Sequence, residues 1–232
     1  MRTPPTWSGP LLRFASRHRW SLPLALGSSF FFAHWADEMR ELQLGPFDTA
    51  VAQAVAGLRG HWDALMLTLT RFGEGESLLV LVVLSAALLL ALRRPREAVF
   101  LCTVGMGTLA LNALLKLGFA RARPGAAELY LIHTPSSFSF PSGHALASTT
   151  VLFALVVIAK VAGARGIGLA FLACFAAAVV LGVSASRVYF GVHFPSDVIG
   201  GMLAGAGWVS AVSGWFYPRV LPGEEVPPAE AS

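Results

Sequence analysis

Long apolar stretches recur along this chain, and they constrain its fold more than any other feature. Each is close to the roughly 20 residues that a helix needs to cross a bilayer, and in lipid such stretches must pair their own backbone groups. The first follows several arginines as a signal peptide would, but no small-x-small cleavage site ends it. Six stretches are therefore expected to span a membrane as helices: 20–36, 77–92, 98–117, 145–162, 167–184 and 198–216.

The composition agrees with a membrane protein. Of the 232 residues, 55% are hydrophobic and 13% are charged, and the mean hydropathy is +0.65. A soluble domain of this size usually carries about 25% charged residues. The net charge of +4 is modest and the basic residues form short clusters at span ends, so nucleic acid is not an expected partner. Cys102 and Cys174 lie inside apolar stretches and are interpreted as small buried hydrophobic residues, not as a disulfide.

Basic residues orient the six spans, because loops rich in lysine and arginine stay in the cytoplasm. Of the 17 basic residues, one side of the predicted membrane carries Arg2, Arg13, Arg17, Arg19, Arg93, Arg94, Arg96, Lys160, Arg165 and Arg219. The other side carries Arg40, Arg59, Arg71, Lys116, Arg121, Arg123 and Arg187. Both chain ends are therefore expected in the cytoplasm.

The external segment 46–74, between the first two spans, has a helical pattern of its own. Apolar residues recur there every three or four positions from Phe47 to Phe72. This spacing predicts amphipathic helical structure, broken near Gly57 and Gly60. Two arrangements fit: a helix that lies in the membrane interface, or one that packs on the bundle. At the other end of the chain, residues 218–232 contain four prolines and three glutamates and are predicted to be a flexible tail.

Three polar clusters stand at the ends of predicted spans. The third span ends in KLGFARARP, residues 116–124, and the fourth is preceded by FPSGHA, residues 140–145. SRVYFGVHFPSDV, residues 186–198, joins the fifth span to the sixth. Since successive spans alternate in direction, all three clusters are expected on the same side of the membrane, which is the external side.

Each cluster offers groups that bind an anion. Ser142 and Gly143 are predicted at a helix start, where a hydroxyl and free backbone N–H groups face a ligand, and Pro141 suits the first turn of that helix. An arginine can grip phosphate oxygens in bidentate fashion. Arg123 and Arg187 are the arginines expected to do so. Lys116 adds a third positive charge.

The third cluster also contains a candidate nucleophile. Pro195 suits a helix start, which places Asp197 in the first turn, where the helix dipole favours a carboxylate. Asp197 can reach back to His193 and fix its tautomer, leaving the other ring nitrogen free to attack. His144, at the other helix start, is the candidate proton donor. No group of carboxylates converges on the external face, so no metal is expected.

Taken singly, the clusters have plainer interpretations. They could be an ordinary helix start, a basic cluster that meets lipid headgroups, and a structural or proton-conducting His–Asp pair. Taken together, they resemble the signature of the type 2 phosphatidate phosphatase superfamily, which also includes the vanadium haloperoxidases. The signature K-x6-R-P, P-S-G-H and S-R-x5-H-x3-D is matched without departure by Lys116…Arg123-Pro124, Pro141-Ser142-Gly143-His144 and Ser186-Arg187…His193…Asp197.

The resemblance implies a mechanism for these residues. His193 would attack phosphorus and form a phosphohistidine, Asp197 would orient the imidazole, and His144 would protonate the leaving oxygen. The phosphate oxygens would be held by Lys116, Arg123, Ser142, Gly143 and Arg187. The resemblance implies no metal and no cofactor.

The resemblance also covers the all-α, six-span layout of the bacterial integral-membrane branch, with residues 1–232 as one membrane domain. It implies a lipid phosphatase of the bacterial cytoplasmic membrane whose site faces the exterior, with undecaprenyl diphosphate as the expected substrate. Phosphatidylglycerophosphate, phosphatidate, lipid A phosphates and transfer to another acceptor stay open. An anion transporter with broken helices is the alternative from another class, although the spans are unbroken at their centres. A haloperoxidase role is less expected, because those relatives are soluble.

Overall fold

The computed structural model describes residues 20–133 and 136–218, and these residues form an all-α structure. The predicted all-α class is confirmed. The elements in the described ranges are α2 (Ser21–Arg40), α3 (Gly45–Ala56), α4 (Asp63–Phe72), α5 (Gly75–Ala91), α6 (Pro95–Phe119), the 3₁₀ helix η1 (Ala126–Glu128), α7 (Gly143–Val161), α8 (Gly166–Tyr189) and α9 (Pro195–Phe216). The predicted tail lies, from residue 219 on, outside the described residues.

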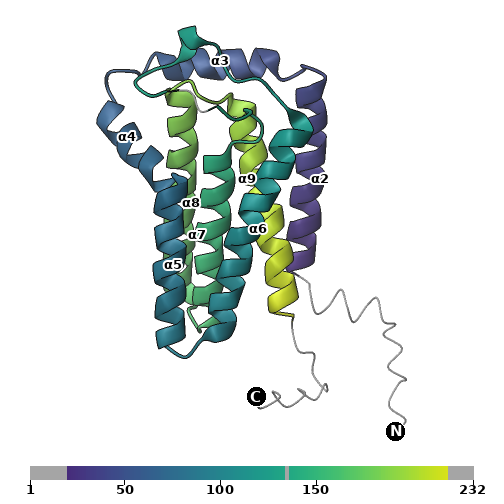
Figure 1. The fold of residues 1–232 in the computed structure, drawn as a ribbon, viewed down its shortest axis with the longest axis vertical. Helices are drawn as coiled ribbons and strands as arrows, with labels where there is room; N and C mark the ends of the chain where they lie inside the picture. The colour runs from purple at the N-terminus through teal and green to yellow at the C-terminus, as the bar shows by residue number, and fades with distance from the viewer. Residues whose placement is uncertain (1–19, 134–135, 219–232) are drawn as a thin grey trace, which may run out of the picture.

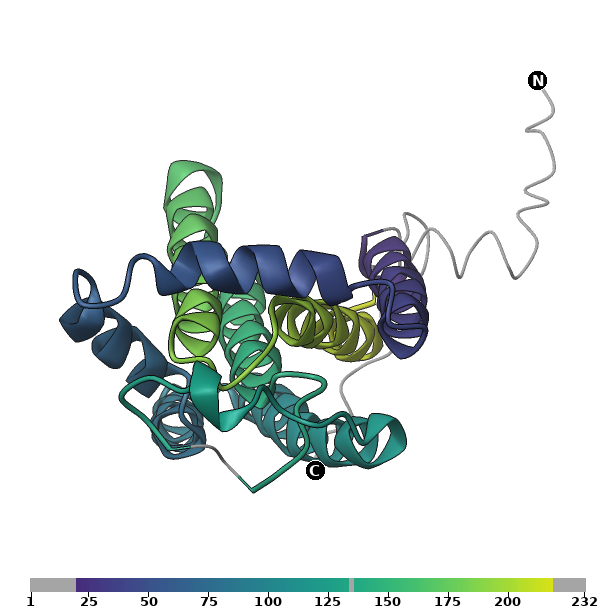
Figure 2. The ribbon, with the colours of Figure 1, turned by 90° about the horizontal axis from the view of Figure 1, so that it is seen from above.

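The long helices run side by side as a bundle, and α3 lies across one end of it (Figure 1). We call the end that carries α3 the upper end. The turns between α5 and α6 and between α7 and α8 lie at the opposite, lower end (Figure 1). Seen from above, α3 passes over the ends of α8 and α9 (Figure 2), and it packs against both.

Several of these helices suit a bilayer. Within the described residues, α6, α7, α8 and α9 are each long and apolar enough to cross a membrane. The pair α4 and α5 counts as a fifth candidate span, bent by 49° at residues 73–74. α2 has 20 residues but is less apolar, because Asp37, Glu38 and Arg40 crowd its last turns. Four or five candidate spans are therefore present, and the predicted count of six is not confirmed.

The segment 46–74 forms two helices, as its apolar spacing predicts. α3 ends at Ala56 and α4 begins at Asp63, so the predicted break around Gly57 and Gly60 is confirmed. α3 packs on α8 and α9, and α4 packs on α8. Both helices are therefore held against the bundle.

Small residues let α9 approach α7 closely. A Cβ atom on Gly201 would lie 2.6 Å from the Ser142 carbonyl oxygen, and one on Gly205 would lie 2.9 Å from the Leu146 carbonyl oxygen. Any side chain at these positions would push the helices apart, since real Cβ contacts are longer. The close packing fixes the start of α9 beside the start of α7, at the upper end.

The outer surface of the bundle is apolar, as bilayer contact requires. Met106, Leu109 and Phe171 are each about two-thirds or more exposed, at 71%, 66% and 72%. Cys102 and Cys174 lie on this surface as well. The interpretation of these cysteines as buried residues is wrong, because the apolar pattern of a span continues on its lipid-facing side, where burial within the protein is not needed.

Candidate active site

The three polar clusters meet at the upper end of the bundle. α6 and α8 end there, and α7 and α9 begin there (Figure 1). His144 interacts electrostatically with His193 and with three cations, which are Lys116, Arg123 and Arg187. The predicted convergence of the clusters on one side is therefore confirmed.

Local backbone geometry aims the chain into this region. Ala120 ends α6 in the left-handed conformation, with φ 46° and ψ 32°, so that the chain turns sharply before Arg121 and Arg123. Pro195 is the first residue of α9, as predicted, and the Phe194 N–H donates to Asp197 Oδ2 at 2.9 Å. Asp197 thus caps its own helix from the third position.

The start of α7 differs from the prediction. α7 begins at Gly143 with Ser142 as its N-cap, so Pro141 lies before the helix and not in its first turn. The Ser142 N–H is not free either, because it donates to the Asp197 carbonyl oxygen at 2.9 Å. This bond ties the start of α7 to the start of α9. The Gly143 N–H remains at the first helical position, where the helix itself offers no partner.

The protonation of His193 follows from its neighbours. Arg123 Nη1 lies 3.1 Å from His193 Nε2, and an arginine can only donate. Nε2 must therefore be the unprotonated nitrogen, and the proton sits on Nδ1. Nδ1 lies 3.4 Å from Asp197 Oδ2 and 3.4 Å from Ser139 Oγ. This is the tautomer that a nucleophilic Nε2 requires.

Burial keeps the His193 ring neutral. It lowers the pKa of the imidazole from 6.5 to about 4, and the neighbouring Asp197 carboxylate only partly offsets this effect. Because the folded-state pKa lies below its usual value, the ring stays unprotonated as pH falls toward 4. Nε2 therefore stays unprotonated throughout the neutral range.

Three side chains of the predicted site carry polar atoms that are buried and have no partner among the described residues. These atoms are Ser142 Oγ, His144 Nε2 and Arg187 Nε. Burying such groups unpaired costs about 1–3 kcal/mol each, so their presence together needs an explanation. All three belong to the predicted phosphate site, and a bound phosphate would supply the missing partners.

Loop residues hold the remaining two cations. Arg123 donates from Nε to the Ser137 carbonyl at 2.7 Å and from Nη1 to the Val192 carbonyl at 2.7 Å. Lys116 Nζ donates to the Phe138 carbonyl. Arg187, on α8, donates from Nη1 to Thr70 Oγ1 at 2.6 Å. Positive charge thus surrounds the region from α6, from α8 and from the loop that follows α6.

The sequence reasoning missed several residues at this end of the bundle. Asn112 lies one turn before Lys116, and its buried Oδ1 has no partner among the described residues. Gly143 leaves the space for it, since a Cβ there would lie 3.2 Å from Asn112 Oδ1. Helical spacing from Lys116 could have found Asn112. Asp48 and Ser139, which contact other parts of the site, have no sequence signal of this kind.

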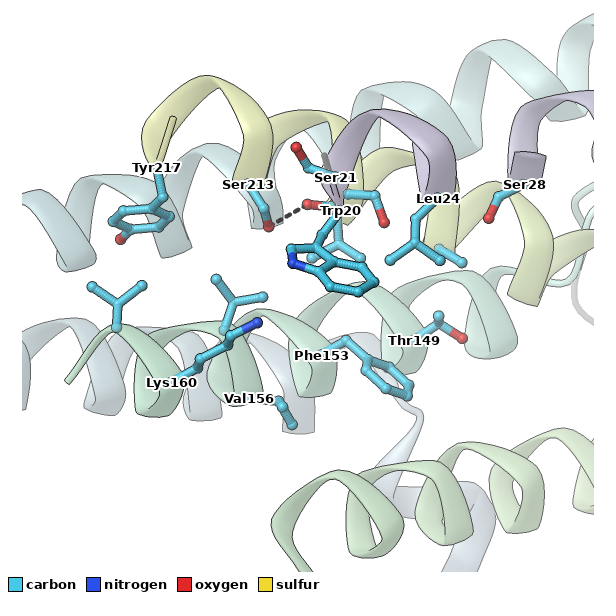
Figure 3. Close-up of a pocket in the computed structure, with 15 residues that line it drawn as sticks. Trp20, Ser21, Leu24, Ser28, Thr149, Phe153, Val156, Lys160, Ser213 and Tyr217 are labelled. Atoms are coloured by element: carbon cyan, nitrogen blue, oxygen red, sulfur yellow. Dashed lines mark hydrogen bonds between the residues drawn. The ribbon is translucent and has the colours of Figure 1, made fainter. Parts of the chain in front are cut away.

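Two cavities help to locate the chemistry. One of about 320 Å³ lies beneath α3 and is lined by His193, Arg59 and Gln53 among others. A larger one, about 550 Å³, opens between α2, α7 and α9 (Figure 3). Lys160 is the one charged side chain among the described residues that line the larger cavity. This larger cavity extends from the far ends of α7 and α9, and none of the predicted site residues line it.

The geometry defines a bundle of long apolar helices with a cluster of cations around a neutral histidine at one end. Within the described ranges, no group of three or more His, Cys, Asp or Glu side chains is placed to hold a metal ion. Residues 97–221 match the PAP2 superfamily, which is more than half of the chain. The chain belongs to this superfamily, and it is a multi-pass integral membrane lipid phosphatase of a metal-independent family.

Relatives that are named for a phosphatase activity agree with this class. The chain is 32% identical to phosphatidylglycerophosphatase B of Bacillus subtilis, over 68% of this chain and 77% of that protein. It is 34% identical to an undecaprenyl-diphosphatase of Sulfolobus acidocaldarius, over 65% of this chain and 68% of that one. It is 38% identical to a lipid A 1-phosphatase of Rhizobium etli, over 47% of this chain and 45% of that protein.

A solved structure shares the fold. It is the crystal structure of a transmembrane PAP2-type phosphatidylglycerolphosphate phosphatase from Bacillus subtilis. The TM-score is 0.71 at 30% identity, and the match covers 83% of this chain and 96% of that one. The bundle and its membrane setting are therefore those of a known integral membrane phosphatase.

Proposed function

We propose that the protein removes a terminal phosphate from a membrane lipid through a phosphohistidine on His193. In the first step His193 Nε2 attacks the terminal phosphorus, and the bond from that phosphorus to the oxygen that stays with the lipid product breaks. His144 gives its proton to that leaving oxygen. The observation that carries this proposal is the placement of the His193 ring, with Nδ1 3.4 Å from Asp197 Oδ2 and Nε2 3.1 Å from Arg123 Nη1.

The second step returns the enzyme to its starting state. Water gives a proton to His144 and its oxygen attacks the phosphohistidine, so that the P–N bond breaks and inorganic phosphate leaves. Nε2 regains its lone pair. Phosphoryl transfer depends mainly on positioning and charge stabilisation. Lys116, Arg123, Arg187, Ser142 and the Gly143 amide would hold the equatorial oxygens and supply the charge that a metal supplies elsewhere.

The proposed substrate is undecaprenyl diphosphate, whose hydrocarbon tail stays in the bilayer while its phosphates reach the upper end of the bundle. The Sulfolobus relative, named for this activity, supports the proposal. Phosphatidylglycerophosphate is the second candidate, because the match to the Bacillus relative named for it covers more of this chain and the protein of the matching crystal structure is named for the same activity. Phosphatidate, lipid A phosphates and transfer to an acceptor other than water are further outcomes of the test.

A panel of lipid phosphates tests the substrate directly. Purified protein in detergent with excess chelator is expected to release inorganic phosphate from undecaprenyl diphosphate with a higher kcat/KM than from the other lipids of the panel. The measurement is phosphate release at matched substrate mole fractions. A preference for phosphatidylglycerophosphate would move the assignment to the second candidate. Loss of activity in chelator, restored by magnesium, would contradict the proposed set of fixed cations.

We further propose six spans with the active site outside the cytoplasm. α2 runs alongside α9 and packs against it (Figure 1), which supports its role as the additional span. Arg93, Arg94 and Arg96 lie at the lower turn between α5 and α6, which the positive-inside rule assigns to the cytoplasm. Basic residues at the upper end are engaged within the protein: Arg40 donates to the Gly118 carbonyl, and Arg59 to the Tyr189 carbonyl.

Single cysteines at the two ends of the bundle test this orientation. Ala127 in η1 and Ala162 at the end of α7 are both exposed. Ala162 is preferred to its neighbour Gly163, whose φ of +105° would strain a cysteine. In a background without Cys102 and Cys174, an impermeant thiol reagent added to intact cells is expected to label Ala127→Cys and spare Ala162→Cys. The opposite labelling would put the site in the cytoplasm.

A further inference from the structure

A buried ion-pair network joins α3 to the carboxylate beside His193. Arg121 donates from Nη2 to Asp48 Oδ2 at 2.7 Å and from Nη1 to Asp197 Oδ1 at 2.6 Å. The two carboxylate side chains are 3% and 0% exposed. Arg121 is one of the unspecified residues between Lys116 and Arg123 in the signature motif, and Asp48 lies on α3, outside all three motifs.

Ser196 strengthens the same connection. Its backbone N–H donates to Asp48 Oδ1 at 2.8 Å, and its hydroxyl donates to Asp48 Oδ2 at 2.7 Å. Ser196 immediately precedes Asp197 in the first turn of α9. Asp48 therefore holds both the arginine that contacts Asp197 and the backbone that carries it.

The network leaves Asp197 with one orientation. Arg121 engages Oδ1, so Oδ2 is the oxygen that faces His193 Nδ1 and takes the Phe194 N–H. The guanidinium is itself held over the Phe194 ring, 4.2 Å from its centroid. An arginine can bond two carboxylates at once through its planar fork, which a lysine cannot do in the same way. If one charge were removed, the others would be buried without full compensation.

We propose that Asp48 and Arg121 are positioning residues for formation of the phosphohistidine. By holding Asp197, they keep the His193 proton on Nδ1 and the Nε2 lone pair directed at phosphorus. α3, which lies across the upper end of the bundle (Figure 2), thereby sets the reactivity of a histidine between α8 and α9. This inference rests on the proposed role of His193 as nucleophile.

Two variants and their combination test the proposal. Asp48→Asn removes the charge but keeps an oxygen for the Ser196 N–H, and Arg121→Ala removes the bridge. Residues that orient metal-binding side chains typically contribute 10- to 100-fold to affinity or activity, and we take the same scale for residues that orient Asp197. Asp48→Asn is expected to lower kcat and the rate of phosphohistidine formation by roughly 10-fold, and Arg121→Ala by roughly 100-fold, with KM within about twofold. In the double variant, Asp48→Asn is expected to add little, because the Asn oxygen keeps the Ser196 N–H bond and the lost charge acts on Asp197 through Arg121.

Asp63→Asn is the matched control. Asp63 is another carboxylate of the upper end, where it accepts bonds from Tyr130 Oη at 2.9 Å and from the Gly60 N–H at 3.0 Å. Its partners do not include Arg121, Ser196 or Asp197 among the described residues. Asp63→Asn is expected to keep the wild-type kcat per folded molecule, even where its thermal stability falls.

The outcomes separate the two levels of the argument. Wild-type protein that forms no acid-labile phosphate would overturn the proposed mechanism and this inference together. Wild-type protein that does form it, with Asp48→Asn and Asp63→Asn equally active, would overturn the inference alone. The inference would also be overturned if the effects of Asp48→Asn and Arg121→Ala on kcat multiplied fully in the double variant, because the two residues would then act separately. Effects on KM and not on kcat would overturn it as well, because they would indicate a role in substrate binding.

Discussion

Replacing His193 by alanine is expected to lower kcat by a factor of about 10⁴ to 10⁶, the scale of losing a covalent nucleophile. The ring is neutral and its Nε2 faces Arg123 at 3.1 Å, so in the proposed mechanism its removal closes the covalent route. The cations and the α7 start remain, and lipid binding is expected to persist. The measurements are phosphate release and the trapping of acid-labile phosphate on the protein from labelled substrate.

His133→Ala is the matched control for this variant. His133 is an exposed histidine in the loop between α6 and α7, and it lies outside the site. The His133→Ala variant is expected to keep the wild-type kcat and the wild-type level of acid-labile phosphate. Substantial phosphatase activity in purified, folded His193→Ala would show that His193 is not the nucleophile.

The sequence contained enough information to predict the helices and the convergence of the three motifs. Helix length in a bilayer is set by membrane thickness, so apolar runs such as 98–117 predict α6 with small errors at the ends. The alternation of span direction then brings the ends of α6 and α8 to the starts of α7 and α9. Pro195 and Asp197 are a local helix-start signal, and their positions in α9 are confirmed.

Features that depend on packing between distant segments could not be predicted in this way. The Asp48–Arg121 pair joins residues 73 positions apart, and the Asp48–Ser196 bonds join residues 148 apart. No spacing rule connects them. The Ser142 N–H was expected to be free because helix starts leave such groups unpaired, but the approach of α9 gives it the Asp197 carbonyl. Tertiary contact overrode a correct local rule.

Arg187→Lys is expected to lower kcat by roughly 10²- to 10³-fold, the scale of losing one donor to developing charge. Arg187 is 4% exposed and is fixed by its bond to Thr70 Oγ1 at 2.6 Å. Its buried Nε has no partner among the described residues, which leaves a donor for an equatorial phosphate oxygen. A lysine keeps the charge but offers a point charge in place of a planar fork.

Orthovanadate separates transition-state binding from substrate binding in this test. Its trigonal-bipyramidal form resembles the transferring phosphoryl group, and an interaction made mainly in the transition state is lost from such an analogue as well. The inhibition constant for vanadate is therefore expected to rise in Arg187→Lys by a factor similar to the fall in kcat, while KM changes less. Thr70→Val is the matched control: it removes the protein partner of Arg187 but keeps the guanidinium, and its effects on kcat and on vanadate are expected to be smaller. Wild-type vanadate inhibition in Arg187→Lys would show that Arg187 supports the fold of α8 against α4 and does not contact the transferring group.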